Sequence, residues 1–542
     1  MNASKLFLTL TGASAALAGS SCSGGKKAPD KPLNVVYIMC DDHSYQTVSA
    51  YDQRYMRTPN IDRLADEGAR FTNSFVANSL SGPSRACLLT GKHSHANGFT
   101  NNEHGIFDGS QQTLPKLLQA GGYQTAMVGK WHLVSDPTGF DYWDILTGQG
   151  DYFNPVFIRN GERIVRPGYS TDITTDVAFE WLDGRDPDKP FCLFLHYKAP
   201  HRSWMPDLQD LGMFDDVTFP LPETFYDDYA TREAAAKQEM SILADMNVVY
   251  DLKMADRENE IHTPEQPWLE DYGRDLYRRD LAPGELVPGR MDAAQQAAWD
   301  AYYDPIIAQF KQDSLSGKAL YEWKFQRYMR DYCSVIHSVD RNVGRVYDYL
   351  KEHGLLDNTV VIYTSDQGFF MGEHGYFDKR FMYEESFRTP LLVRMPGGRR
   401  HRDIDAFVQN IDYAPTILEM AGLPVPEDIQ GESFLPLLQG VKPSKVMTTE
   451  GKGWRKSLYY HYYEYPAEHS VRRHYGVRTE RYSLMHFYND IDEWELFDLE
   501  QDPLQLHNLY GEPGMEAVTE ELLAELHRLQ ALYEDPISRI IP

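Results

Sequence analysis

Short apolar runs alternate with longer amphipathic stretches through most of the chain. Four of these runs are rich in β-branched or other apolar residues and carry no charge: 34–39 (NVVYIM), 125–128 (TAMV), 191–196 (FCLFLH) and 359–363 (TVVIY). Continuous apolar runs of this length, with helical stretches between them, are typical of central strands in a parallel sheet that is covered on both faces. We therefore predict an α/β fold with a large, mostly parallel central sheet flanked by helices.

The pattern changes from about Val446 onward. The stretches SLYYHYYEYP, RRHYGVRTERYSLMHFY and EWELFDLEQDP alternate apolar and polar residues with turn signals between them, which favours a small antiparallel sheet. A terminal helix over roughly 514–533 should pack on it. We thus expect a larger N-terminal domain over 33–445 and a smaller α+β subdomain over 446–542. The charged segment 204–322, with helical patches such as TREAAAKQEMSILADMNVVY, is expected to be an excursion from the main sheet.

The N-terminus has a pattern of its own. Lys5 precedes an apolar run that is too short to span a bilayer and that ends in small residues before Cys22, as in a secretory signal. We predict a signal peptide over 1–22, a flexible linker over 23–32, and an exported protein. Lipidation of Cys22 would make it an outer-membrane-anchored lipoprotein; plain cleavage would leave a soluble periplasmic protein.

Composition narrows the class of protein further. The chain has 542 residues, enough for two domains, and a formal net charge of −27, which argues against nucleic acid as a partner. An anionic substrate stays possible where the site itself is locally positive. The other four cysteines lie in or beside apolar segments, so we predict buried thiols rather than disulfides or a zinc site.

Polar residues directly follow the predicted strands. In chain order they are Asp41-Asp42, Lys130 with His132, His201, and Asp366-Gln367. Each alone is a weak signal, since such residues are more often part of a turn, a helix cap, a loop or the surface. Because ligands of open α/β sheets bind beyond the carboxyl ends of the strands, we expect all of them to share one rim. Three carboxylates and an amide oxygen favour Ca²⁺ or Mg²⁺ over zinc, whereas lysine and histidine suit an anion.

The stretch SLSGPSRACLLTG, 79–91, predicts a helix start with unusual chemistry. Pro83 suits the first helical turn and Ser81 can cap free amides. Ser81 and Arg85 lie four residues apart, on one face of the helix, and a helix N-terminus favours anions. This arrangement indicates a nucleophile that meets a negatively charged group.

These residues resemble the signature of type I, formylglycine-dependent sulfatases of the alkaline phosphatase superfamily. The signature is a Cys or Ser followed by x-Pro-x-Arg and then Leu-Thr-Gly, here Ser81 to Arg85 and Leu89 to Gly91. Its companions follow in chain order: Asp41-Asp42, Gly129-Lys130-Trp131-His132, Ala199-Pro200-His201, Asp366-Gln367-Gly368 and Lys379. The similarity runs from about Leu33 to the C-terminus. It implies an alkaline phosphatase-like fold and hydrolysis of a sulfate ester.

The resemblance also implies a modification and a metal. Ser81 would be oxidised to Cα-formylglycine, whose hydrated aldehyde is the nucleophile; because position 81 is Ser, a radical SAM maturase of the anaerobic kind is the implied partner. One Ca²⁺ would be held by Asp41, Asp42, Ser81 in its modified form, Asp366 and Gln367, of which Gln367 departs from the more usual Asn.

Catalytic roles carry over by the same resemblance. Arg85 and Lys130 would hold the diol, and His132 would take its proton in the second step. His201 and Lys379 would grip the sulfate, and His201 would protonate the leaving oxygen.

The substrate is expected to be a sulfated glycan. The turn HSVRRHYG gathers basic residues in an acidic chain, and such groups suit a charged sugar, so Arg473 and His474 are predicted to bind substrate. The chain as a whole resembles bacterial N-acetylglucosamine-6-sulfatases, which implies exo-acting removal of 6-O-sulfate from mucin O-glycans or heparan-type chains. Alternatives are 6-sulfated galactose or GalNAc, a sulfated uronic acid, a phosphatase or phosphonate hydrolase, and a non-catalytic glycan-binding protein.

Overall fold

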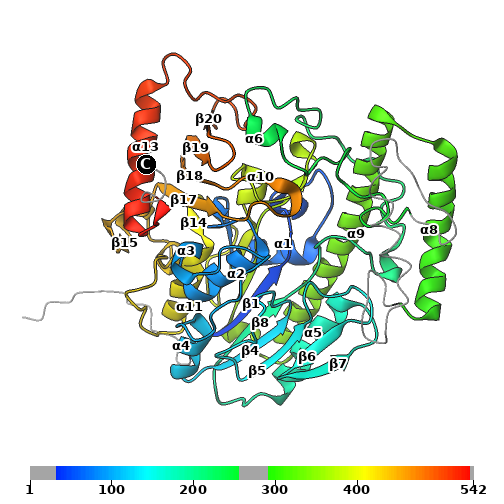
Figure 1. Cartoon of the computed structure of the whole chain (residues 1–542). Coiled ribbons are helices and arrows are strands. Elements are labelled where there is room, and N and C mark those ends of the chain that lie inside the picture. The colour runs from blue at the N-terminus through cyan, green and yellow to red at the C-terminus, as the bar shows by residue number, and fades with distance from the viewer. Residues whose placement is uncertain (1–31, 255–290, 538–542) are drawn as a thin grey trace, which may run out of the picture.

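A ten-stranded sheet forms the centre of the molecule (Figure 1). The structure, a computed structural model, describes residues 32–254 and 291–537. The strand order is β13-β2-β12-β9-β1-β8-β4-β5-β6-β7. The predicted signal peptide, Cys22 and the predicted linker up to residue 31 lie outside the described residues.

The four strands predicted from apolar runs form the middle of this sheet. They are β1 (Asn34–Cys40), β4 (Gln124–Gly129), β8 (Phe191–His196) and β9 (Thr359–Ser365). β1 pairs in parallel with β8 and β9, and β8 with β4. The mostly parallel central sheet is therefore confirmed.

Shorter strands extend the sheet at both edges. β5 (Tyr142–Leu146) continues it in parallel, and β6 (Val156–Arg159) and β7 (Glu162–Val165) follow as antiparallel strands. On the other side β12 (Leu391–Arg394) and β2 (Ala69–Phe71) are antiparallel, and β13 (Arg402–Ile404) pairs with β2 in parallel.

Helices cover both faces of the sheet. Alternate residues of a strand point to opposite faces: Val36 and Ile38 enter one core, and Val35 and Tyr37 enter the other. The first core is covered by α1 (Pro59–Asp66), α5 (Ser170–Gly184) and α9 (Gly317–Glu352). The second is covered by α2 (Ser81–Thr90), α4 (Leu114–Ala120) and α11 (Tyr413–Met420). Burial on both faces explains why the central strands are continuously apolar.

The C-terminal region has the predicted antiparallel sheet. Its strands are β17 (Ser457–Tyr462), β18 (His474–Thr479), β19 (Tyr482–Phe487) and β20 (Glu493–Asp498), paired in sequence order. Tyr459 faces the terminal helix α13 (Glu516–Leu532), whereas Tyr460 packs toward Phe387 of the larger part. Sheet and helix thus confirm this part of the predicted fold class; the domain boundary at 445/446 stays a prediction.

The segment 231–250 differs from its predicted helical character. Within it only α6 (Glu233–Ala236) is helical. The amide of Ile242 donates to Gly375 O, and that of Glu239 donates to His469 O, while Ile242 and Met246 are buried in the main core. These long-range contacts outweigh the local helix propensity of the segment.

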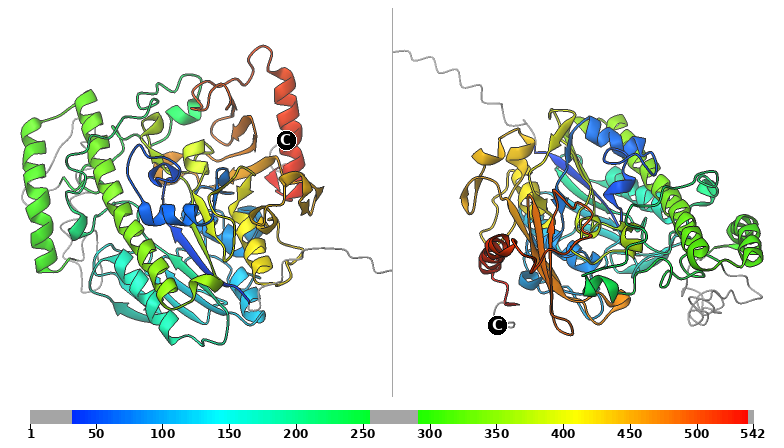
Figure 2. Two further views of the ribbon diagram at one scale, coloured as in Figure 1. Left: turned by 180° about the vertical axis from the view of Figure 1, so that it is seen from behind. Right: turned by 90° about the horizontal axis from the view of Figure 1, so that it is seen from above.

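Two long helices stand at one side of the molecule. α8 (Ala293–Asp313) runs beside the first half of α9, as Figure 2 shows from two further directions. Among the described residues no helix has the length and apolarity needed to cross a membrane.

The remaining short elements are η1 (Tyr45–Thr47), β3 (Ser74–Phe75), α3 (Ser94–Asn97), η2 (Leu208–Asp210), η4 (Leu356–Asn358), β10 (Phe370–Met371), η5 (Glu373–Gly375), β11 (Phe377–Asp378), α10 (Glu384–Phe387), β14 (Val408–Gln409), η6 (Asn410–Asp412), α12 (Leu435–Leu438), η7 (Pro443–Lys445), β15 (Met447–Thr448), β16 (Gly451–Lys452) and η8 (Glu468–Ser470).

The four cysteines in the described part of the chain are free and buried, as predicted: Cys40, Cys87, Cys192 and Cys333.

Candidate active site

The carboxyl ends of the central strands bring the predicted polar residues together. Asp41 and Asp42 follow β1 and Asp366 follows β9, and all three carboxylates are buried. The Asp42 amide donates to Asp366 Oδ1 at 3.1 Å, so residues that are more than 300 positions apart in the chain share one small space. This is the rim that the strand pattern predicts.

Ser81 lies at the start of α2, over this rim. Its hydroxyl donates to Asp41 Oδ1 at 3.0 Å. The next amide, of Gly82, donates to Asn102 Oδ1 at 3.1 Å, and a Cβ at position 82 would lie 2.5 Å from Asn102 and Phe99. A larger residue at position 82 would therefore require the Asn102 and Phe99 side chains to move.

Arg85 lies one helical turn beyond Ser81 and is itself buried. Its Nε and Nη2 donate to Asp366 Oδ2 at 3.2 and 2.9 Å, and Nη1 donates to the Lys130 carbonyl at 2.8 Å. Arg85 Nη2 also lies 3.8 Å from Asp41. This side chain thus ties the serine helix to two strand ends.

Lys130 enters the site from the end of β4. Gly129 precedes it with φ of 97°, and a Cβ there would lie 2.0 Å from His196 O, so glycine alone permits this turn. Lys130 Nζ donates to Asp41 Oδ2 and to Gln149 Oε1. Gln149 Nε2 lies 3.2 Å from His132 Nε2. Gln149 therefore links the two predicted catalytic residues, and it was not among the residues predicted from the sequence.

Lys379 and His201 approach the rim from the opposite side. Lys379 Nζ donates to both oxygens of Asp42, at 2.6 and 2.8 Å, and His201 Nε2 lies 3.8 Å from Asp42 Oδ2. His201 Nδ1 donates to the Arg202 carbonyl at 2.6 Å, which leaves Nε2 to face the site. Burial, and then the nearby lysines, hold the pKa of His201 well below its usual value, which favours the neutral imidazole.

The donor set fits a hard divalent cation. Ligand atoms of Asp41, Asp42 and His201 all lie within 4.8 Å of one another. Gln367 donates through Nε2 to Asp42, while its Oε1 is buried with no hydrogen-bond partner. An unpaired buried amide oxygen beside carboxylates is the kind of atom that a Ca²⁺ ion takes as a ligand. His201 is the one histidine in this cluster among the described residues, whereas zinc sites favour nitrogen and sulfur ligands.

One further lysine lies in the site without having been predicted. Lys198, three residues before His201, is buried, and its ammonium lies 4.8 Å from the centroid of the Tyr152 ring. Burial lowers the pKa of Lys198 to about 8. It follows a strand end as the predicted residues do, but an isolated lysine carries no motif that would have marked it.

The residues of the stretch predicted to bind substrate lie in two different environments, the aromatic core and the active site. His474 is fully buried; its Nδ1 donates to Arg472 O and its Nε2 accepts from the Met382 amide, at 2.8 and 3.1 Å. Arg473 donates to Tyr465 O at 2.6 Å. Both side chains thus hold backbone partners, while Arg473 Nε is buried without one; a substrate role for Arg473 or His474 stays a prediction.

His469, in the same stretch, reaches the site instead. Its Nε2 lies 3.2 Å from Asp378 Oδ2, and Arg380 also donates to Asp378. Asp378 and Arg380 flank Lys379 with φ of 77° and 93°, conformations that cost energy and are concentrated at functional sites.

Comparisons with known proteins agree with this geometry. A family model described as "Sulfatase" matches residues 33–423, and one described as "N-sulphoglucosamine sulphohydrolase, C-terminal" matches residues 372–532. The chain is 49% identical to an N-acetylglucosamine-6-O-sulfatase of Bacteroides thetaiotaomicron over 98% of this chain and 92% of the relative.

Solved structures share the fold. BT4656, solved in complex with its substrate D-glucosamine-2-N,6-O-disulfate, matches with a TM-score of 0.85 and 49% identity over 93% of this chain and 99% of that one. The phosphonate monoester hydrolase of Agrobacterium radiobacter matches with a TM-score of 0.63 and 21% identity, over 93% of this chain and 96% of that one. At this identity the match shows a shared fold and nothing further. With the family matched across most of its length and the signature serine set over a carboxylate rim, the chain belongs to the sulfatase family and is a sulfuric ester hydrolase.

Proposed function

We propose that this sulfatase removes the 6-O-sulfate from a terminal N-acetylglucosamine or N-sulfoglucosamine unit of a host glycan, so that it acts at the end of the glycan. The observation that carries the proposal is the 49% identity, over 98% of this chain, to a relative named N-acetylglucosamine-6-O-sulfatase. The disulfated glucosamine that is the substrate of BT4656 supports a heparan-type chain ahead of a mucin O-glycan.

The proposal includes formylglycine at position 81. Formylglycine made from Ser81 would supply a hydrated aldehyde whose hydroxyl attacks sulfur, which an unactivated serine hydroxyl does poorly. Asp41 lies 3.0 Å from the Ser81 hydroxyl, and Lys130, held by Asp41 and Gln149, presents a cation on the same side. These contacts orient the group at position 81 toward the rim.

The proposed metal is a single Ca²⁺ held by Asp41, Asp42, Asp366, Gln367 and the modified residue 81. Such an ion would act as a Lewis acid on a sulfate oxygen. Three carboxylates of the rim contact three cations, Arg85, Lys130 and Lys379. A divalent cation would leave the site positive, and a sulfate ester would offset that charge.

The leaving-group proton is assigned to His201. Its Nε2 faces the site while Nδ1 is fixed on a carbonyl. Burial, and then nearby lysines, lower its pKa. The negative charge of a bound sulfate would act in the opposite direction, so proton uptake by His201 would be coupled to substrate binding. Lys379 and Lys198 stay available to neutralise the sulfate.

Asp378, Arg380 and His469 are proposed to select the sugar. All three are buried and form one hydrogen-bonded group next to Lys379. A carboxylate between a guanidinium and an imidazole offers both acceptors and donors to vicinal hydroxyls. A sugar that presented its hydroxyls in another orientation would leave these groups unpaired, which is costly in a buried site.

Maturation and location are proposed from the sequence alone. The serine at position 81 supports a radical SAM maturase of the anaerobic kind as partner, and the segment 1–22 supports export to the periplasm or, through Cys22, to the outer membrane.

Sulfate release by the matured protein tests the proposal. Mass spectrometry first establishes formylglycine at position 81. Release is then compared on GlcNAc-6-sulfate, N,6-disulfated glucosamine, and 6-sulfated galactose and GalNAc. Preference for the glucosamine esters is expected; release from 6-sulfated galactose or GalNAc alone would overturn the substrate while leaving the enzyme class intact.

A further inference from the structure

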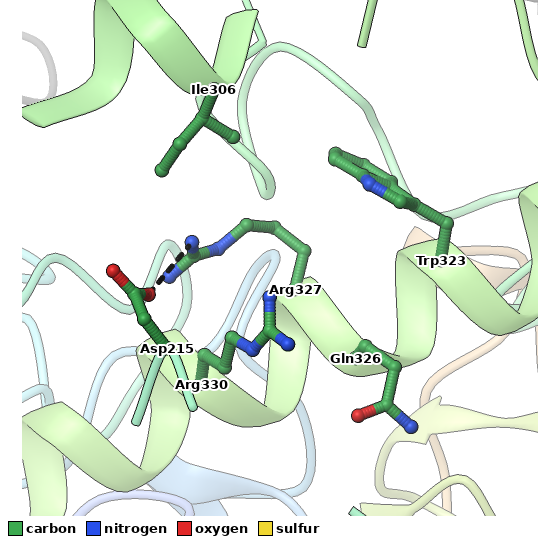
Figure 3. A pocket seen from close by; sticks show the side chains of 6 residues that line it. All are labelled: Asp215, Ile306, Trp323, Gln326, Arg327 and Arg330. Carbon is green, nitrogen blue, oxygen red and sulfur yellow. Dashed lines mark ion pairs between the residues drawn. The ribbon is translucent and has the colours of Figure 1, made fainter. Parts of the chain in front are cut away.

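A second pocket lies on the far side of α9 from the catalytic rim. Trp323, Gln326, Arg327 and Arg330 are spaced three, four and seven residues apart, so they share one face of the helix. Ile306 from α8 and Asp215 close the cavity, which has a volume of about 270 Å³ (Figure 3).

The opposite face of α9 supports the catalytic site. Tyr332 donates to the Asp42 carbonyl at 2.6 Å, and Tyr328 donates to the Phe370 carbonyl at 2.9 Å. One rigid helix therefore separates the pocket from the rim. The residues that line the pocket have no part in the proposed reaction.

The walls of the pocket are fixed by their own contacts. Gln326 accepts from the Phe219 amide at 2.9 Å and donates to the Phe219 carbonyl at 2.8 Å. Trp323 packs on Phe310 with ring centroids 4.3 Å apart, and its indole also lines the pocket. The cavity thus has a preformed aromatic wall, as sites for small ligands commonly do.

Two arginines provide donors that the protein does not use. Arg327 is 4% exposed and contacts Asp331 and the Tyr302 hydroxyl, and Arg330 donates to the Val217 carbonyl at 3.3 Å. The Nε atoms of both arginines are buried without a hydrogen-bond partner. Figure 3 shows the Arg327 guanidinium beside Asp215 and the Arg330 guanidinium between Asp215 and Gln326. A ligand group in the cavity could complete these buried donors, which have no partner in the protein.

The charges around the pocket favour an anion. Asp331 meets Arg327 and also accepts from Lys253 Nζ at 3.0 Å. Asp215 accepts from the Tyr302 hydroxyl at 2.7 Å and lies 4.0 Å from Arg327. Of the residues that line the pocket itself, two are cations, Arg327 and Arg330, and one is a carboxylate, Asp215, in a chain whose net charge is −27.

We propose that this pocket binds a sulfated or carboxylated sugar unit of the glycan, away from the catalytic site. The aromatic wall suits the face of a pyranose ring, the guanidinium groups suit its anionic substituent, and Asp215 can accept from a hydroxyl. The proposal rests on the proposed function in one respect: it takes this glycan to be the chain that the enzyme desulfates. A second contact with the same chain raises the local concentration of its ends at the rim.

Binding of a heparin-derived hexasaccharide tests the proposal. Calorimetric titrations use the full chain carrying Ser81→Ala, which prevents turnover, with a saturating glucosamine disulfate to occupy the rim. Trp323→Ala, Arg330→Ala and Ile306→Trp, which fills the cavity, are each expected to weaken binding about tenfold. Lys318→Ala is the matched control, because it removes a 73% exposed charge from the same helix outside the pocket, and it should change binding less than about twofold.

Each outcome decides the matter. Equal binding by the pocket variants and by Lys318→Ala would overturn the proposal, as would loss of all binding in the wild-type pocket when the rim is occupied. A neutral hexasaccharide, without sulfate or carboxylate groups, that binds equally well would show that the pocket does not require an anion. Inorganic sulfate that displaces the hexasaccharide at equal concentration would show that the pocket does not recognise the sugar. Ile306→Trp keeps the test valid should Trp323→Ala not fold. No arm requires catalysis, so failure of the proposed substrate would show separately, as absent sulfate release.

Discussion

The catalytic rim and the C-terminal sheet both bury titratable side chains, but they treat the charge in opposite ways. At the rim, the carboxylates of Asp41 and Asp42 contact Lys130 and Lys379 directly. In the C-terminal sheet, burial lowers the pKa of His474 to about 3 and raises that of Glu495 to about 8, so both are neutral at neutral pH. Burial also raises the pKa of Asp42, to about 7, but there the charge of Lys379 opposes it. The difference teaches that a buried charge is kept where a counter-charge lies beside it, as it also does at the Arg327–Asp331 pair, whereas burial neutralises His474 and Glu495.

The largest effect is expected from the serine at the rim. Ser81→Ala removes the formylglycine precursor, so sulfate release should fall at least about a thousandfold. The serine makes one hydrogen bond, to Asp41, so the unfolding temperature should stay within about 3 °C of the wild type. Sulfate release and thermal unfolding measured on one preparation check both statements.

Residual turnover in Ser81→Ala above about a tenth of the wild-type value would contradict the mechanism. Calcium content of the same variant separates loss of the nucleophile from loss of the metal.

The amide oxygen of Gln367 gives the next effect. Gln367→Leu removes the buried oxygen that has no partner in the protein, so calcium affinity should fall at least about tenfold, and activity with it. Gln367→Asn, which keeps an amide oxygen, is the matched control and should retain the metal. Metal analysis after dialysis against a chelator series provides the measurement; equal calcium retention by all three proteins would exclude Gln367 as a ligand.

Two histidines that lie five residues apart, His469 in η8 and His474 at the start of β18, sharpen the comparison. His469 contacts Asp378 of the rim, whereas His474 lies in the aromatic core against Phe381 and Phe487. His469→Ala should lower kcat/KM about tenfold, mainly through KM. His474→Ala should instead lower the free energy of unfolding by about 2–4 kcal/mol.

The activity of folded His474→Ala should remain within about twofold of wild type. Kinetics on several sulfated sugars, together with urea unfolding, separate the two effects. The reverse pattern would restore the substrate role that the sequence predicts for His474.

The strands and the rim were predictable because their signals are local. Continuous apolar runs report burial on both faces, and the strand-end rule then places Asp41, Asp42 and Asp366 together without any knowledge of distant contacts. His474 shows the limit of that logic, because the rings that bury it include Phe381, which lies outside its own sheet, as well as Phe487, Tyr460 and Tyr462 from that sheet.

Other site residues could not be found in this way. Gln149 lies on a loop after β5 and contacts Lys130 only in the folded structure. Lys198 is a single lysine that follows an apolar strand. Asp378 and Arg380 flank a recognised lysine, yet only their positive φ values and their contact with His469 mark them. The positions of such residues depend on tertiary packing, and the periodicity of apolar residues in the sequence carries no information about it.

The smallest expected effect concerns a carboxyl of the C-terminal sheet. Burial, and then the neighbouring Glu493, raise the pKa of Glu495 from 4.5 to about 8. The folded state then holds this proton more tightly than the unfolded chain, so stability contributed by the protonated form is lost as pH rises from about 4.5 through 8. Glu495→Gln keeps the shape and cannot titrate, so its free energy of unfolding should fall less steeply, by at most about 1.4 kcal/mol per pH unit. Urea unfolding at several pH values across that window compares it with wild type and with the exposed control Glu480→Gln. If all three slopes agree, Glu495 is ionised in the folded protein, and the contrast between a charged rim and a neutral C-terminal core fails at this residue.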